Sequence, residues 1–484
     1  VPRSHMTSKH DRYESPLATR YASLAMQENF SARRRALVWR DLWIALAECE
    51  KELGIAISGA QIQALKDARD DVDLDRVAEL ERELRHDVMA HVHAYGEQAP
   101  AARGVLHLGA TSCFVADGAD LVLIRDGLQI LRARLLDAAR RFASLAREHR
   151  ALPMIAFTHF QPAQPTTMGK RVCLWLQDLL FDLEELERLL DDLPFRGVKG
   201  TTGTQASFLQ LFGGDHDKVR SLDRMVTERM GFARNLPVCG QTYPRKWDAR
   251  LLNVVAGIGI SASKFSTDLR LLAHRREVEE PFGDRQIGSS AMPYKRNPMR
   301  SERVGALSRY LMELAPNAWH TAANQWLERT LDDSANRRIA IPESFLAADA
   351  ILMLVSDIAN GMVVWPKVIE ANLRRELPFL ATESVLMAAV GAGGDRQDLH
   401  ERIRVHSHES AARLKQGAAD NDLLERIAGD PAFAAVAGEL PSLLEPARFV
   451  GRAPEQVDEF LAEVVDPLLA ARAHVAVPAG EIKV

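Results

Sequence analysis

Cysteines are scarce in this sequence, and long apolar runs are missing. Its 4 cysteines are Cys49, Cys113, Cys173 and Cys239, and no two of them form a Cys-x-x-Cys pair. No segment resembles a signal peptide, and no apolar run is long enough to cross a bilayer. These absences predict a soluble protein of the reducing cytoplasm that makes no membrane contact.

A large excess of either charge is also missing. Lysine and arginine number 61 against 66 aspartate and glutamate residues, so the formal net charge is −5. This balance provides no general attraction to nucleic acid or to an anionic membrane, and an anionic ligand requires a local cluster of Arg and Lys. The 484 residues are 47% hydrophobic and 26% charged, as in a globular chain with two or three domains.

Runs with the two-residue period of strands are missing as well, and helical periodicity takes their place. Apolar residues recur at helical spacings over 121–145 and 172–190. A third run, 251–272, is also apolar between those positions, so we expect it to be the central helix, surrounded on most sides. Further helices are expected at about 298–316 and 340–363. Five long helices predict an all-α fold built on an antiparallel bundle.

This pattern predicts three helical domains. The bundle occupies 112–364, shorter helices precede it in 7–111, and a segment with Gly- and Asp-rich turns follows in 365–484. Residues 1–6 resemble the remnant of a cleavable expression tag. Because the 251–272 helix is apolar on more than one face, we expect bundles to pack against bundles in an oligomer.

A glycine- and proline-punctuated stretch interrupts the helices at 288–298. It reads Gly-Ser-Ser-Ala-Met-Pro-Tyr-Lys-Arg-Asn-Pro. Pro293 and Pro298 bar a helix here, while Asn297 and Pro298 suit the N-cap and first turn of a following helix. Two hydroxyls and two cations on a flexible stretch are compatible with a solvated connection or with a functional loop.

Two histidines have sequence neighbours that make them candidates for a catalytic role. His86 lies beside Asp87, which is a plausible helix cap, and the pair is either a surface contact or a poised imidazole. Glu83 and His86 have the spacing of a carboxylate-bridged metal site, but no other of the 15 histidines has a glutamate three residues earlier, so no metal is expected. His159 lies in a stiff, proline-containing connection, 158–167, which favours an acid/base role.

Two further segments suit anion binding. The turn at 107–112 offers hydroxyls and open amides before a long helix, where it either holds an anion or caps the helix. The polar segment 328–338 contains three arginines. It forms either an ion-pair network at a domain junction or a fork that grips a phosphate or carboxylate.

Together these motifs resemble the fumarase/aspartase superfamily, whose lyases release fumarate from a succinyl group. The 288–298 string is similar to the superfamily signature. Beyond residue 6, essentially the whole chain is similar to the adenylosuccinate lyase family in its animal-type form. The matching motifs are Arg20-Tyr21, Arg85-His86-Asp87, Thr111-Ser112, Thr158-His159, 199–206, Gln241, 288–303 and 329–338.

The resemblance implies a reaction and an assembly. The reaction is elimination of fumarate from adenylosuccinate, which leaves AMP, and from SAICAR, which leaves AICAR, in purine nucleotide biosynthesis. Ser289 is implied as general base, His159 as general acid, and His86 and Lys295 as further catalytic residues. His86 either contacts the phosphate or supports His159. No cofactor or metal is implied. The assembly is a homotetramer around a shared helical core, with each active site drawn from three subunits.

The resemblance also implies a set of substrate-binding residues. They are Arg20, Tyr21, Arg85, His86, Asp87, Thr111, Ser112, Thr158, Gln241, Lys295, Asn297, Arg303, Arg329, Ser334 and Arg338.

Two alternative functions stay open. The 288–298 string is shared with lyases of the argininosuccinate and aspartate type, although the arginines at 20 and in 329–338 favour a substrate with an added phosphate. A non-catalytic structural relative is the other alternative. Such a protein would be expected to lose Ser289, Lys295 and His159, and all three are present.

Overall fold

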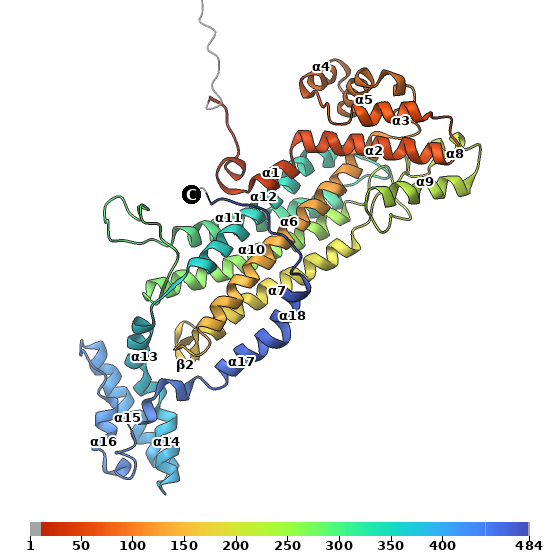
Figure 1. Cartoon of the computed structure of the whole chain (residues 1–484). Helices are drawn as coiled ribbons and strands as arrows, with labels where there is room; N and C mark the ends of the chain where they lie inside the picture. Colours follow the sequence, from red (N-terminus) through yellow and green to blue (C-terminus); the bar gives the residue numbers. More distant parts are fainter. Residues whose placement is uncertain (1–10, 441, 483–484) are drawn as a thin grey trace, which may run out of the picture.

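Five long helices dominate the computed structural model, which describes residues 11–440 and 442–482. They lie side by side along the length of the molecule (Figure 1). Their bounds are α6 (Ser112–Glu148), α7 (Met168–Asp192), α10 (Lys246–His274), α11 (Met299–Ala323) and α12 (Asp332–Gly361). The all-α class with five long helices is confirmed. The expected tag remnant lies outside the described residues, and the domain boundaries stay predictions.

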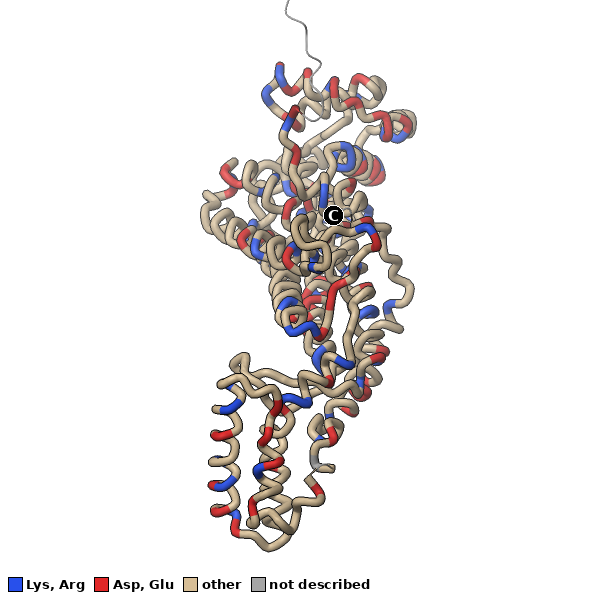
Figure 2. Tube along the Cα trace, turned by 90° about the vertical axis from the view of Figure 1, so that its left-hand side faces the viewer, with Lys and Arg blue, Asp and Glu red and all other residues tan. Residues whose placement is uncertain are grey.

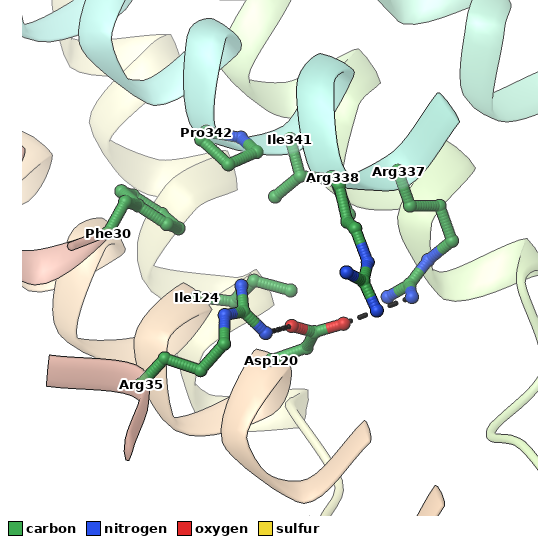
Figure 3. A pocket seen from close by; sticks show the side chains of 8 residues that line it. All are labelled: Phe30, Arg35, Asp120, Ile124, Arg337, Arg338, Ile341 and Pro342. Carbon is green, nitrogen blue, oxygen red and sulfur yellow. Dashed lines mark hydrogen bonds and ion pairs between the residues drawn. The ribbon is translucent and has the colours of Figure 1, made fainter. Parts of the chain in front are cut away.

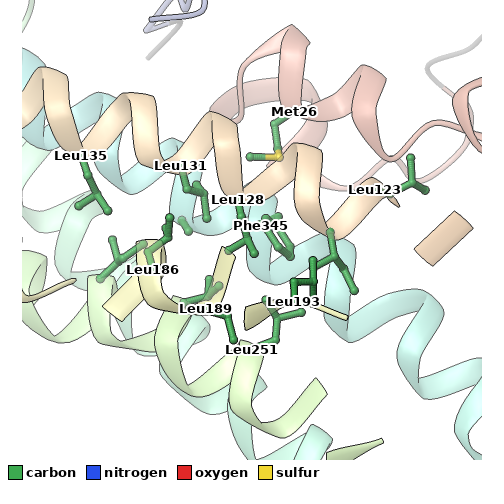
Figure 4. Packing of buried hydrophobic residues seen from close by; sticks show 14 of the residues in the cluster. Met26, Leu123, Leu128, Leu131, Leu135, Leu186, Leu189, Leu193, Leu251 and Phe345 are labelled. Atoms are coloured by element: carbon green, nitrogen blue, oxygen red, sulfur yellow. The ribbon is translucent and has the colours of Figure 1, made fainter. Parts of the chain in front are cut away.

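Leucine-rich stripes hold the bundle together. Leu128 and Leu131 of α6 lie near Leu186 and Leu189 of α7, and Phe345 of α12 fills the space between them (Figure 4). All five side chains are at most 3% exposed. Burying a side chain of this size contributes about 1.5–3 kcal/mol, so the 3.6-residue periodicity of the sequence determines which face of each helix turns inward.

The central helix is α12 and not, as expected, α10. Among the described helices, α12 alone combines the length and hydropathy of a membrane span, which the sequence analysis did not anticipate, but 78% of its apolar window is buried. It is therefore a core helix. By contrast, α10 leaves Ile260 61% exposed and Leu271 38% exposed. Two of the apolar positions between the α10 seam residues thus face outward in the single chain.

Two helix boundaries differ from expectation. The helix α11 continues through Pro316 to Ala323, and α12 begins at Asp332, well before 340, with Pro342 inside it. Much of the polar segment 328–338 therefore forms the first turns of a helix. Asp332 and Asp333 interact favourably with the partial positive charge of that helix N-terminus.

A β-hairpin joins α6 and α7, where no strand was expected. Its strands β1 (Pro153–Thr158) and β2 (Gln161–Thr167) pair antiparallel, and Pro162 and Pro165 lie in β2. Prolines argue against a strand, but both strands of a two-stranded sheet are edges, where a missing N–H costs no ladder bond. A second short pair joins β3 (Val278–Glu279) to β4 (Val363–Val364).

Smaller helices cover the two ends of the bundle (Figure 1). The N-terminal ones are η2 (Leu17–Tyr21), α1 (Leu24–Asn29), α2 (Ala32–Glu52), α3 (Gly59–Asp67), α4 (Leu74–Leu84), α5 (Asp87–Gln98) and η3 (Pro100–Ala102). Between α7 and α10 come α8 (Ala206–Leu211) and α9 (His216–Arg229).

At the other end of the bundle, α13 (Pro366–Leu380) packs on the hairpin through Leu373 and Leu377. A separate hydrophobic core within 385–440 unites α14 (Thr382–Gly391), α15 (Arg396–Lys415), α16 (Leu423–Gly429) and η4 (Pro431–Phe433). Positive and negative residues are interspersed along these helices (Figure 2). The chain then returns to the bundle through η5 (Ser442–Leu444), η6 (Pro446–Phe449), α17 (Ala453–Phe460), η7 (Leu461–Val465) and α18 (Asp466–Ala471).

Candidate active site

A pocket of about 500 Å³ lies where α2 and α5 meet the first turns of α6 and α12. Seven of the predicted site residues line it, although they come from distant parts of the sequence. They are His86, Asp87, Ser112, Gln241, Arg329, Ser334 and Arg338. The fold of a single chain therefore assembles one part of the predicted site.

His86 is fixed at the start of α5. It is the N-cap residue, and its Nδ1 accepts the backbone N–H of Met89 at 3.3 Å. The sequence analysis placed the cap at Asp87, which is instead the first helical residue and accepts the N–H of Val88 at 2.8 Å. Because Nδ1 accepts, a neutral His86 carries its proton on Nε2, which lies 3.3 Å from the hydroxyl oxygen of Ser112.

An ion pair crosses the pocket from α5 to α12. Arg338 Nη2 donates to Asp87 Oδ2 at 2.5 Å, and the Arg338 side chain is 63% exposed. Burial alone would raise the pKa of Asp87, but the bonds from Arg338 and from the Val88 amide hold it below its ordinary value. Asp87 is thus an anion near neutral pH, and Arg338 keeps donors free for a ligand.

The pocket floor is an ion-pair network whose partners on α2 and α6 the sequence analysis missed. Asp120 on α6 pairs with Arg35 at 2.5 Å and with Arg337 at 3.0 Å (Figure 3). Burial would raise the pKa of Asp120, but the two guanidinium groups lower it to about 2. The signal was present in the sequence, because Asp117 and Asp120 interrupt the otherwise apolar stretch 113–124 of this helix. An acidic residue in such a place needs a buried cation as partner.

A smaller cavity of about 20 Å³ adjoins this network and shares Arg338 with the main pocket. Figure 3 shows the Arg338 side chain beside the Asp120–Arg337 contact. A space of this size holds about one water molecule. The polar segment at the start of α12 thus contains both a buried member of the ion-pair network, Arg337, and an exposed pocket residue, Arg338.

His159 lies elsewhere, in the tight turn of the β1–β2 hairpin. It is exposed, and His159 and Phe160 have positive φ values of 52° and 56°. A two-residue turn with both residues left-handed normally contains Asn or Gly. Histidine and phenylalanine are strained there, and strain of this kind concentrates at functional positions. Thr158 pairs with Gln161 at the base of the turn and is also exposed.

The long helix α6 separates His159 from His86. His86 contacts the first residue of α6, whereas the hairpin follows the last one. With 37 residues, α6 spans roughly 55 Å at 1.5 Å per residue. One chain therefore does not bring the two histidines into one site.

The 288–298 loop forms a third group, between β3 and α11. Ser289 Oγ accepts the N–H of Met292 at 3.1 Å, and Asn297 Nδ2 donates to the carbonyl of Gly288 at 2.6 Å. Lys295 is exposed. The expected N-cap role of Asn297 is wrong, because Pro298 occupies that position. Glu280 satisfies the amides at the start of α11 instead, accepting from Arg300 and Ser301 at 2.8 and 2.9 Å.

The remaining predicted residues lie apart from the pocket. Arg303 on α11 places its guanidinium 5.9 Å from the ring of Tyr21, and the neighbouring Arg20 is exposed on η2. Thr111 is the N-cap residue of α6 but makes no side-chain cap bond. Arg85 is exposed at the end of α4, with a left-handed backbone. Within 11–440 and 442–482, no cluster of three His, Cys, Asp or Glu side chains is arranged to hold a metal.

Comparisons with known proteins cover nearly the whole chain. Residues 20–312 match the family described as Lyase, and residues 378–460 match the family described as Adenylosuccinate lyase C-terminus. The adenylosuccinate lyase of Schistosoma mansoni is 52% identical over 461 residues, covering 95% of this chain and 96% of the relative. That of Saccharomyces cerevisiae is also 52% identical, over 465 residues, with the same coverage.

Solved structures match in fold. The 3-carboxy-cis,cis-muconate lactonizing enzyme from Pseudomonas putida superimposes with a TM-score of 0.82 and 22% identity, covering 95% of this chain and 100% of the other. A fumarate lyase from Mesorhizobium sp. BNC1 has a TM-score of 0.80 at 23% identity, covering 93% and 100%. At these identities the likeness establishes the shared helical fold alone.

Proposed function

The chain belongs to the adenylosuccinate lyase family, and we propose that it eliminates fumarate from adenylosuccinate to leave AMP, and from SAICAR to leave AICAR. Membership identifies it as a lyase and confirms the family that its motifs resemble. The observation that carries the finer proposal is the pocket in which Arg329, Ser334 and Arg338 lie with His86. This set suits a phosphate, which succinyl substrates without a nucleotide lack.

In this proposal, the pocket binds the phosphoribosyl part of the substrate. Arg329 and Arg338 supply guanidinium donors to phosphate oxygens, and Ser334 supplies a hydroxyl. Arg20, Tyr21 and Arg303, which lie near one another in the structure, contribute further contacts from another part of a composite site. Gln241 completes the pocket side, where Arg85 and Thr111 are the sequence neighbours of the pocket residues His86 and Ser112. Thr158, Lys295 and Asn297 contribute to the succinyl side.

The chemistry needs a base, an acid and a cradle for negative charge. The base removes a C–H proton beside a carboxylate, the C–N bond then breaks, and the acid protonates the departing nitrogen. We assign Ser289 as base, because the Met292 amide that donates to its Oγ would also stabilise the alkoxide. The Lys295 ammonium adds charge stabilisation. His159 is assigned as acid, since imidazole both holds and releases a proton near neutrality.

We further propose a cytoplasmic homotetramer with sites shared between three subunits. The length of α6 supports it, because a second subunit must supply His159 to a pocket that contains His86. Exposed apolar side chains on α7 and α10 also support it. Leu174 is 48% exposed, Phe181 57% and Ile260 61%, and packing four bundles together would cover such a surface.

The test is release of fumarate, followed by ultraviolet absorbance, from adenylosuccinate, SAICAR, argininosuccinate and aspartate. The proposal expects turnover of the first two substrates and none above background with the others. Ser289→Ala serves as the inactive control in the same preparation. If only argininosuccinate or only aspartate is turned over, that compound is the substrate and the proposal is wrong. If the folded tetramer turns over none of the four, the chain is better explained as a non-catalytic structural relative of these lyases.

A further inference from the structure

Along one wall of the pocket, buried ion pairs form a relay that ends at Arg329. Arg245, the N-cap residue of α10, donates from its two terminal nitrogens to both carboxylate oxygens of Asp117 on α6, at 3.1 and 2.9 Å. Its Nε donates to Asp333 Oδ2 at 2.6 Å. The other oxygen of Asp333 accepts from Arg329 Nη1 at 2.7 Å. The relay therefore connects α6, α10 and α12 to a pocket residue.

The inner members of the relay are shielded from water. The Arg245 side chain is 2% exposed and that of Asp333 is 1% exposed. Burial would raise the pKa of Asp333, but Arg245 and Arg329 hold it below its ordinary value. The Asp333 carboxylate is therefore ionised at neutral pH. A buried carboxylate with two cationic partners has a well-defined position, because losing either partner leaves an uncompensated charge.

Arg329 itself is held along one side only. Its Nη1 donates to Asp333 and to the carbonyl of Thr330. Within residues 11–440 and 442–482, its Nε and Nη2 donate to no other residue. Arg329 lies in the irregular connection between α11 and α12, so no helix fixes its backbone. The Asp333 bond thus sets the direction of the guanidinium, and the remaining donors are left for the pocket.

We propose that Asp333 and Arg245 are positioning residues for oxyanion binding, in which Asp333 aims the guanidinium of Arg329 at the pocket and Arg245 holds Asp333. The inference rests on the proposed function, where Arg329 binds the substrate phosphate. A guanidinium aligned beforehand loses less side-chain entropy when it binds an oxyanion, so the relay increases affinity for the phosphate without touching it.

The test compares AMP with adenosine, which differ only by the phosphate. Asp333→Asn keeps the shape of the side chain but removes its charge. By calorimetry, we expect the Kd of AMP to rise about tenfold and that of adenosine to change by less than about twofold. Inorganic phosphate should compete with AMP less effectively in the variant. In turnover, KM should rise with kcat little changed, because the relay acts on binding and not on the bonds that break.

A double-mutant cycle separates positioning from a general structural effect. In an Arg329→Ala background, Asp333→Asn should weaken AMP binding by less than about twofold, because the group to be positioned is already gone. An equal loss of AMP affinity in both backgrounds would overturn the inference. So would a loss of adenosine affinity as large as the loss for AMP.

Glu187→Gln is the matched control. Glu187 on α7 is also shared by two arginines, Arg132 and Arg472, but does not line the pocket. The Glu187→Gln substitution should lower the Tm of the protein without changing the ratio of its AMP affinity to its adenosine affinity. If Asp333→Asn does not fold, Arg245→Lys tests the relay, because lysine keeps a charge but lacks the fork that bridges Asp117 and Asp333. An unchanged AMP Kd in that variant would overturn the inference.

The binding assays are independent of turnover, so the two hypotheses fail separately. A folded chain without lyase activity that binds AMP through the Asp333-dependent interaction would refute the proposed reaction and keep the relay. A chain that turns over adenylosuccinate and SAICAR but binds AMP and adenosine equally well, with or without Asp333, would refute the relay and keep the reaction.

Discussion

The Nε2 atom of His86 lies 3.3 Å from the Oγ atom of Ser112. His86 caps α5 and Ser112 is the first residue of α6, so this contact joins the starts of two helices at one end of the bundle. The hairpin that carries His159 follows the opposite end of α6. Because a rigid helix separates the two histidines, variants that lack one or the other test directly whether two subunits share a site.

A mixture of inactive His86→Ala and His159→Ala chains should therefore regain activity after dissociation and reassembly. With equal, random mixing and separate donors, each site receives both intact residues with a probability of roughly a quarter. Fumarate release per site measures the recovery. If hybrid tetramers form, as judged by mass spectrometry with one chain isotopically labelled, and activity stays at background, both histidines come from one subunit.

Ser289→Ala should lower kcat by orders of magnitude and leave the KM nearly unchanged, because the hydroxyl acts in the transition state. Ser290→Ala is the neighbouring control and should retain most of the activity. Steady-state kinetics with adenylosuccinate as substrate measure both constants. A Ser289→Ala enzyme that keeps kcat within about tenfold, roughly 1.4 kcal/mol of barrier, excludes Ser289 as the base.

Asn297→Ala should loosen the 288–298 loop, since its side chain closes the loop through the 2.6 Å bond to the Gly288 carbonyl. We expect faster cleavage within the loop by trypsin, and suppression of cleavage by AMP with fumarate in both variant and wild type. Tyr294→Ala is the control, because Tyr294 is 83% exposed and its side chain does not bridge the ends of the loop. Equal cleavage of all three proteins would contradict the closing role of Asn297.

Phe160→Gly should stabilise the protein while lowering kcat. Glycine adopts the positive φ of this turn without strain, and the expected gain is about 1 kcal/mol, measured by urea unfolding. The more flexible turn should hold His159 less firmly. Phe160→Leu removes the ring but keeps the strain, so it should not be stabilised. If Phe160→Gly and Phe160→Leu lose the same free energy of unfolding, packing of the ring contributes more to stability at this position than relief of backbone strain.

Glu50→Gln should stabilise the protein at alkaline pH. Glu50 is fully buried on α2, and both carboxylate oxygens lack a hydrogen-bond partner within the described residues. Burial raises the pKa of Glu50 to about 8 from an ordinary 4.5. Unfolding therefore releases a proton between these values, so the glutamate costs stability increasingly as the pH rises from about 4.5 to about 8.

The measurement is the Tm of wild type and Glu50→Gln across that range. The two values should differ least near pH 4.5, and the advantage of glutamine should grow up to about pH 8 and then level off. Glu187→Gln provides the contrast, because Arg132 and Arg472 lower the pKa of Glu187 despite its partial burial. Its Tm should fall below that of wild type at neutral pH. A constant Tm difference for Glu50→Gln would mean that Glu50 does not titrate as the structure implies.

Helical periodicity alone was enough to predict the bundle. The apolar spacing over 121–145 and 172–190 places one stripe of each helix in the core, and local patterns of this kind depend only on neighbouring residues. The same reasoning misplaced one limit each of α11 and α12, because α11 continues past Pro316 to Ala323 and α12 begins at Asp332, well before 340. It also failed at the hairpin, where prolines are tolerated because both strands are edges.

Motifs identified the candidate site residues, but not which of them meet. The sequence by itself determined the family resemblance, the acid/base candidates and the concentration of arginines near 329–338. Only the tertiary structure decided that Arg337 is buried on Asp248 and Asp120 while Arg338 lines the pocket. Only it revealed the relay from Asp117 through Arg245 to Asp333. The physical reason is that a buried ion pair joins residues far apart in sequence, and its partners are selected by packing, which no local pattern records.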